Sequence, residues 1–167
     1  SESKVEWGTL PALGEVTTGT SITSYGSNKL HTVQLIGLHT SARYYYRVIT
    51  GNLTSEIYDF IMPSDPMDEG SFKIVAMSDM QRDNSNPNKF EEIVHDGIIT
   101  YFADNYFGDL PLDLQMILVP GDLVDNGWSY SQWANTFFAP AHPLFAHVPV
   151  YPVLGNHESD TDYYFDY

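Results

Sequence analysis

The alternation of apolar strands with a helical period between residues 72 and 154 constrains the fold of this chain most strongly. Residues 72–77 and 116–119 are nearly continuous apolar runs, which are typical of strands buried on both faces of a sheet. A third strand is expected over residues 150–154. Between the first two runs, apolar side chains recur at helical spacing, at Phe90, Ile93, Val94, Ile98, Tyr101 and Phe102. This order predicts an α/β sheet with crossover helices.

The sequence also predicts where these helices begin and end. Asn86 is suited to cap the first helix, and Pro87 is suited to its first position. A second helix is expected over residues 131–138, ending before Pro140, because the residue before a proline disfavours helical conformation. Pro152 lies inside the third strand and has no N–H to donate, so that strand is expected at an edge or a bulge.

Residues 3–61 show no helical period and predict strands separated by turns. Alternating or β-branched segments occupy residues 5–9, 31–38, 44–49 and 57–62. Within them, Leu38, Tyr44, Tyr46 and Val48 resemble the tyrosine corner of fibronectin type III sandwiches. In such a corner the phenol oxygen of the tyrosine bonds to nearby backbone and fixes the crossing of the chain.

We therefore expect three parts in the chain. Residues 1–62 are predicted to form a fibronectin type III-like β-sandwich, which lacks its first strands because a complete seven-stranded sandwich takes about 100 residues. Residues 63–70 contain two prolines, a glycine and three acids, and predict a linker. Residues 71–167 are predicted to form the α/β part.

Polar side chains follow each of the three α/β strands at the end where such sheets bind ligands. The segments are SDMQ at 78–81, GDLVDNG at 121–127 and GNHE at 155–158. Carboxylate and amide oxygens are metal ligands, and histidine is a common acid or base. Any one of these acids alone is better explained as a turn residue. The ordered set on three strand ends predicts a catalytic metal site.

This ordered set resembles the calcineurin-like metallophosphoesterases, and the β-sandwich in front of it resembles their purple acid phosphatase-like branch. The resemblance covers most of the chain but only the N-terminal half of the catalytic domain. It implies hydrolysis of phosphate esters, with monoesters foremost, by a metal-activated hydroxide at a dinuclear site. The two metal ions would be iron, manganese or zinc.

The resemblance also implies a role for each motif residue in holding the metals. Asp79 would bind the first metal, Asp122 would bridge both, and Asn156 would bind the second. Gln81 stands where many family members have histidine, and its amide oxygen would be a ligand to a hard metal. The later histidine ligands of the family, which end in a Gly-His-x-His element, do not occur in this chain. We therefore expect these 167 residues alone to bind metal weakly and to have little activity.

Two further residues are implied in catalysis. His157 would donate a proton to the leaving oxygen or stabilise the transition state. Asp125 would orient His157 through its carboxylate and favour the protonated ring. Asp125 is also suited to cap the helix that follows it.

Composition narrows the range of partners. The formal net charge of −15 argues against a nucleic-acid-binding surface. No apolar run approaches the ~20 residues of a membrane span. We expect a small phosphorylated substrate and an extracellular or periplasmic location. The alternative function is a non-enzymatic, exported binding or adhesion module whose phosphoesterase-like domain is degenerate.

Overall fold

The computed structural model describes residues 3–23 and 28–166, and the chain divides into two compact units. The first unit, Ser1–Gly70, contains strands and no helix among its described residues. The second unit, Ser71–Tyr167, contains parallel strands and helices. The predicted order of an all-β part followed by an α/β part is therefore confirmed.

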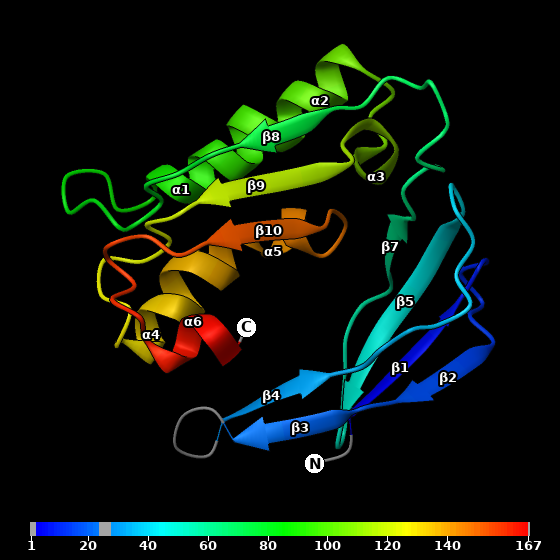
Figure 1. Cartoon of the computed structure of the whole chain (residues 1–167), viewed down its shortest axis with the longest axis horizontal. Coiled ribbons are helices and arrows are strands. Elements are labelled where there is room, and N and C mark those ends of the chain that lie inside the picture. Colours follow the sequence, from blue (N-terminus) through cyan, green and yellow to red (C-terminus); the bar gives the residue numbers. More distant parts are fainter. Residues whose placement is uncertain (1–2, 24–27, 167) are drawn as a thin grey trace. The chain divides into compact units, whose positions relative to one another are not determined.

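Antiparallel pairing organises the first unit (Figure 1). Its strands are β1 (Ser3–Gly8), β2 (Glu15–Thr18), β3 (Thr20–Thr23), β4 (Lys29–Thr32), β5 (Arg43–Thr50), β6 (Leu53–Thr54) and β7 (Tyr58–Ile61). One sheet has the order β2-β1-β5-β6, with β7 also paired to β5, and β3 pairs with β4 in a separate hairpin. The longest strand, β5, is rich in aromatic and β-branched residues, which suit a central strand.

The strand expected over residues 31–38 is wrong in its extent. Strand β4 ends at Thr32, and residues 33–38 form no strand. Ile36 is 73% exposed, so the alternating pattern does not bury one face here. Gly37 adopts a φ of 74°, which turns the chain out of the extended conformation.

The tyrosine corner has the contact expected of it. Tyr44 is 2% exposed, and its phenol oxygen accepts a hydrogen bond of 2.9 Å from the backbone N–H of His39. Its ring stacks on Phe60 and packs against Trp7, both at centroid distances of 5.7 Å. One side chain therefore fixes the loop before β5 to the packed face of the sheet.

Replacing Tyr44 with phenylalanine is expected to lower the free energy of unfolding of the first unit by about 1 kcal/mol, because it removes one hydrogen bond and keeps the ring packing. Urea unfolding followed by circular dichroism measures this change. Tyr45→Phe is the matched control, because Tyr45 alternates to the other face of β5. Equal losses in the two variants would contradict a structural role for the corner.

The second unit is built on three parallel strands. They are β8 (Ile74–Ala76), β9 (Met116–Pro120) and β10 (Val150–Val153), in the order β10-β9-β8. The first crossover contains α1 (Lys89–Glu92), the π-helical segment η1 (Ile93–Ile99), α2 (Thr100–Asn105) and α3 (Leu110–Asp113). The second contains α4 (Tyr130–Gln132), the π-helical segment η2 (Trp133–Phe138) and α5 (Ala139–Phe145), and α6 (Asp162–Asp166) follows β10.

Both predicted helix boundaries are wrong. The first helix begins at Lys89, because Asp83 accepts hydrogen bonds from Ser85 and Asn86 and holds residues 83–88 in turns. The second does not end before Pro140. Pro140 instead lies near the start of α5, which directly continues η2 with helical backbone at Phe138, so the helical segment runs past this proline. Among the described residues, none of the helices is both long and apolar enough to cross a membrane.

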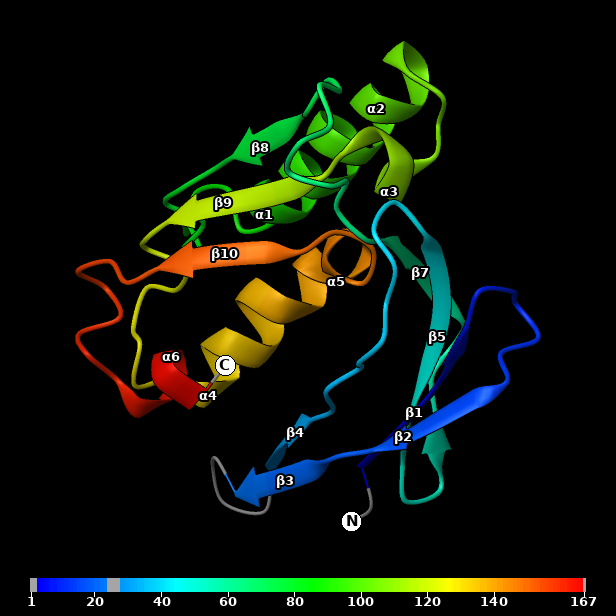
Figure 2. The same cartoon turned by 45° about the vertical axis from the view of Figure 1, so that its right-hand side comes forward.

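The crossover helices cover one face of the sheet. Successive right-handed crossovers that advance in one direction place their helices on the same face, and Figure 2 shows α1 and α5 on the same side of the strands. Ile117 and Val119 of β9 are fully buried against this layer, together with Val94, Trp133, Phe137 and Leu144. The core of the second unit therefore lies between the sheet and its helices.

The opposite face of the sheet is open in the described structure. Ile74, Tyr151 and Val153 are 48%, 52% and 58% exposed. The expectation that residues 72–77 form a strand buried on both faces is therefore wrong for this chain, since β8 is a short edge strand. The expectation for Pro152 is met, because β10 forms the other edge of the three-stranded sheet.

Candidate functional site

The three parallel strands bring the segments that follow them to one edge of the sheet. In Figure 1 the arrowheads of β8, β9 and β10 point the same way, and the chain leaves all three strands on that side. The segments carry the six predicted site residues Asp79, Gln81, Asp122, Asp125, Asn156 and His157. The N–H of Met80 donates a hydrogen bond of 3.0 Å to the Asp122 carbonyl, so the segments after β8 and β9 are in contact.

Two of the predicted metal ligands have an unusual backbone conformation. Asp79 and Asp122 have φ angles of 57° and 54°, in the left-handed region that non-glycine residues rarely adopt. This conformation costs about 1–2 kcal/mol per residue, so surrounding contacts must hold it in place. Backbone strain of this kind gathers at functional sites. Leu13, Ser41, Ser159 and Asp160 share this conformation, so it does not by itself mark a site.

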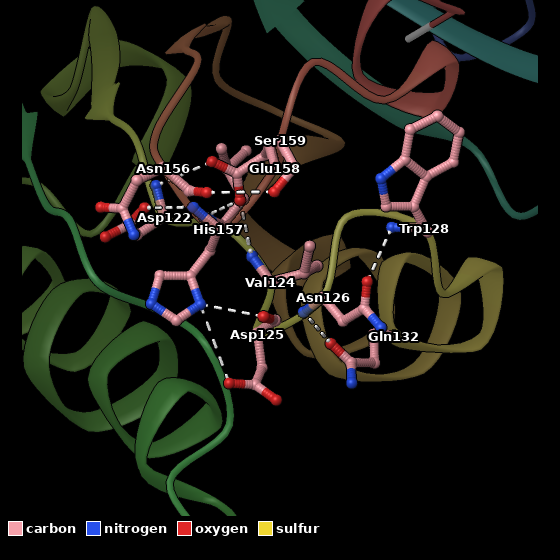
Figure 3. A network of polar contacts seen from close by, with 11 residues as sticks. Asp122, Val124, Asp125, Asn126, Trp128, Gln132, Asn156, His157, Glu158 and Ser159 are labelled. Carbon is pink, nitrogen blue, oxygen red and sulfur yellow. Dashed lines mark hydrogen bonds and ion pairs between the residues drawn. The ribbon is translucent and has the colours of Figure 1, made fainter.

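The segments 121–127 and 155–158 approach so closely that two positions require glycine. A Cβ atom on Gly155 would lie 2.2 Å from the backbone nitrogen of Asp122, and one on Gly127 would lie 2.3 Å from the Glu158 carbonyl oxygen. Hydrogen bonds join the same segments, since Gly127 N–H donates to the His157 carbonyl at 3.0 Å. The two segments therefore form one interlocked pair, shown in Figure 3.

His157 is held at both its backbone and its ring. Its N–H donates to Oδ1 of Asp122 at 3.1 Å, and its ring Nδ1 lies 2.9 Å from the backbone carbonyl of Asp125. The Asp125 carboxylate is further away, with Oδ1 at 3.8 Å from Nδ1. A carbonyl only accepts hydrogen bonds, so Nδ1 carries a proton and Nε2 is the atom turned away from Asp125 (Figure 3). Asp125 therefore contacts the His157 ring through its carbonyl at hydrogen-bond distance and through its carboxylate at 3.8 Å, and the orienting role of the carboxylate stays a prediction.

These surroundings favour the protonated ring. The hydrogen bond to the Asp125 carbonyl raises the pKa of His157 above its ordinary value of 6.5. Desolvation lowers the pKa in part, and the negative charges of Asp122, Asp125 and Glu158 raise it further. A histidine whose pKa is raised in the folded state stabilises that state fully below its unfolded pKa. The contribution is lost as the pH rises through the folded pKa.

We therefore expect the His157 ring, followed by NMR in the metal-free chain, to titrate above pH 6.5. In Asp125→Asn part of this rise in pKa is expected to remain, because the backbone carbonyl that is its largest single cause is unchanged. A His157 that titrates at or below 6.5 would contradict the observed ring contact. A complete loss of the rise in Asp125→Asn would show that the carboxylate orients the ring instead.

Sequence reasoning missed Glu158, which is fully buried behind the site. Its carboxylate accepts hydrogen bonds from four backbone N–H groups, those of Asp122 (3.0 Å), Leu123 (2.8 Å), Val124 (3.2 Å) and Gly155 (2.8 Å). The available signal was an acid inside a glycine-introduced turn, where backbone N–H groups need acceptors. Its burial depends on the contact between two segments that are distant in sequence.

Comparison with known proteins identifies the second unit. The family model of the calcineurin-like phosphoesterases matches residues 72–167, which is more than half of the chain. The chain belongs to the calcineurin-like phosphoesterase family. The match contains all three motif segments and both members of the interlocked pair.

Nearly the whole length of this calcineurin-like phosphoesterase chain is similar to part of a solved structure. It is the purple acid phosphatase PPD1 isolated from yellow lupin (Lupinus luteus) seeds, with a TM-score of 0.69 and 22% sequence identity. The match covers 94% of this chain and 30% of the lupin chain, so this chain spans less than a third of that protein. At this identity the similarity shows the fold. No curated protein matches the chain.

Gln81 has a polar atom without a partner. Its Oε1 is buried and accepts no hydrogen bond among the described residues, although a buried acceptor normally has one. Gln81 lines a cavity of about 360 Å³, which the described residues Asp79, Asp122 and Asn156 do not line. The structure thus brings Asp122, Asn156 and His157 together, whereas Gln81 lines a separate cavity.

The donor atoms fit part of the metal centre that the family implies. The carboxylates of Asp79 and Asp122 and the amide oxygens of Gln81 and Asn156 suit a hard cation, and the buried Oε1 of Gln81 has no hydrogen-bond partner among the described residues. Across residues 3–23 and 28–166, no three histidine, aspartate or glutamate side chains lie close enough together to hold a metal ion. A dinuclear centre therefore needs ligands beyond the described residues.

Proposed function

We propose that this chain forms part of a metal-dependent phosphatase that hydrolyses small phosphate esters, with monoesters as the foremost substrates. The observation that carries the proposal is the meeting of Asp122, Asn156 and His157 on the interlocked pair, at the carboxyl ends of parallel strands. The family match over residues 72–167 supports the same reaction class.

In this proposal the oxygen ligands divide between two metal ions. Asp79 would hold one ion, Asn156 would hold the other, Asp122 would be a ligand to both, and Gln81 would add its amide oxygen. When bound, the metals supply a hydroxide nucleophile near neutral pH and offset the charge of the phosphate. The described residues contribute no imidazole to this set. Its remaining ligands are proposed to come from polypeptide beyond residue 167, and these residues alone are proposed to be weakly active or inactive.

His157 is proposed to be the proton donor. The Asp125 carbonyl holds Nδ1 as a donor, so Nε2 is the nitrogen that can give its proton to the leaving oxygen. The raised pKa keeps the ring protonated to a higher pH than an ordinary histidine. A cavity of about 320 Å³ is lined by Asp125, Arg82 and other polar side chains. These side chains suit the polar, non-reacting part of a phosphate ester.

Two measurements test the proposal. The first is the coding sequence beyond residue 167, which is expected to continue and to supply histidines, including a Gly-His-x-His element. The second is phosphate release from p-nitrophenyl phosphate by the complete protein, with Mn²⁺, Zn²⁺ or iron added and with EDTA as the control. Release that depends on metal supports the phosphatase. A complete protein that gives none, but retains binding to a surface or glycan, would support the non-enzymatic module instead.

A further inference from the structure

Glu158 is an unusual residue for the interior of the second unit. It is 0% exposed, and a carboxylate removed from water is costly unless hydrogen bonds meet its charge. Four backbone N–H groups do so here, at 2.8 to 3.2 Å. Hydrogen bonds from N–H groups to an ionised carboxylate are stronger than those to neutral acceptors. The interaction is therefore strong enough to fix the backbone that makes it.

The four donors belong to both members of the interlocked pair. Oε2 accepts from Gly155 in its own segment and from Asp122 in the segment after β9. Oε1 accepts from the next two residues of that segment, Leu123 and Val124. Three successive N–H groups thus converge on one carboxylate. This convergence holds the peptide units on both sides of Asp122 and explains how that residue keeps its left-handed φ of 54°.

The side chain of Asp122 then sets the next contact. Its Oδ1 accepts the backbone N–H of His157 at 3.1 Å, so the position of Asp122 also fixes the start of the His157 side chain. We propose that Glu158 is a positioning residue of this site, whose carboxylate imposes the backbone conformation that places Asp122 against Asn156 and His157. Its effect on metal binding rests on the proposed function, whereas its effect on the two segments does not.

Glutamine is the informative replacement at this position. It keeps the size of Glu158 but replaces one acceptor oxygen with an NH₂ group, which would face backbone N–H groups that also donate. Asp113→Asn is the matched control, because Asp113 is a second buried acid of the same unit, 1% exposed, and bonds the N–H of Asp109 away from the site.

Amide hydrogen exchange of the metal-free chain tests the positioning directly. The amides of Asp122, Leu123, Val124 and Gly155 are expected to be protected in the wild type. In Glu158→Gln they are expected to exchange at least tenfold faster, and in Asp113→Asn they are expected to keep their rates. If Glu158→Gln does not fold, the exchange rates of the wild type still test the proposal. Wild-type rates at these four amides as fast as those of exposed loops would overturn it. Unchanged rates in a folded Glu158→Gln overturn it as well.

Mn²⁺ binding followed by electron paramagnetic resonance tests the link to the site. Glu158→Gln is expected to bind Mn²⁺ at least tenfold more weakly than the wild type, and Asp113→Asn is expected to stay within twofold. Equal weakening in both variants would reduce Glu158 to a structural role and overturn the proposal. If the wild type shows no Mn²⁺ binding that depends on Asp122, the proposed function loses support, and the exchange rates alone decide the role of Glu158.

Discussion

Alanine in place of Gly155 is expected to lower the free energy of unfolding of the second unit by at least about 3 kcal/mol, at the upper end of overpacking effects. The added Cβ would lie 2.2 Å from the backbone nitrogen and from Oδ1 of Asp122, and 2.8 Å from Oε2 of Glu158. The backbone nitrogen of Asp122 and Oε2 of Glu158 are hydrogen-bonded to each other, so a side-chain rotation cannot relieve the clash. The segments after β9 and β10 would have to separate.

Gly97→Ala is the matched control for this substitution. Gly97 lies in the π-helical segment η1, and the nearest atom to its added Cβ would be a side-chain carbon of Ile93 at 3.9 Å. Alanine is expected to stabilise the unit there by about 0.5–1 kcal/mol, because it restricts the unfolded chain and favours helix. Urea unfolding of both variants measures the difference. A Gly155→Ala variant as stable as Gly97→Ala would contradict the close approach of the two segments.

Asp122→Asn is expected to reduce the metal-dependent phosphatase activity of the complete protein at least about 1,000-fold, which corresponds to about 4 kcal/mol of transition-state stabilisation. Asparagine keeps the size of the side chain and the Oδ1 that accepts the His157 N–H, so the fold is expected to remain. The lost charge is the one proposed to bridge two cations. Initial rates with p-nitrophenyl phosphate at saturating Mn²⁺ measure the effect.

Asp104→Asn removes the same charge from an exposed position of α2 and is the control for a general effect of net charge. It is expected to leave the rate within twofold. Activity in Asp122→Asn that stays within tenfold of the wild type would contradict the bridging role. Asp125→Asn is expected to reduce the rate less than Asp122→Asn, because His157 bonds to the carbonyl of that residue.

The sequence predicts those features of the fold that depend on local patterns. The apolar runs at 116–119 and 150–154 place two parallel strands within a residue or two, and the tyrosine pattern predicts the contact of Tyr44 with nearby backbone. The predictions of the helix ends were wrong because prolines and asparagines are compatible both with a turn and with the first turn of a helix. The spacing of apolar residues does not reveal the π-helical segment η2, which runs directly into α5 and carries the helical segment past Pro140.

The candidate site divides in the same way. Its three segments follow from strand ends and glycines, so Asp122, Asn156 and His157 could be predicted. The burial of Glu158 and the crowding at Gly155 could not, because both depend on an approach between segments that are distant in sequence. The hydrogen bond of the His157 ring to the carbonyl of Asp125 depends on local turn geometry that residue types do not specify.

The interlocked pair also determines when the site can form. Its cross-segment bonds join residues 30 to 36 positions apart, and each closes only after the second crossover has returned β10 to the side of β9. Closing such long loops is slow compared with forming a helix. The contacts between the two segments therefore form late in folding. A cation would bind the folded unit and raise its melting temperature by mass action, and it would not act as a nucleus for the chain.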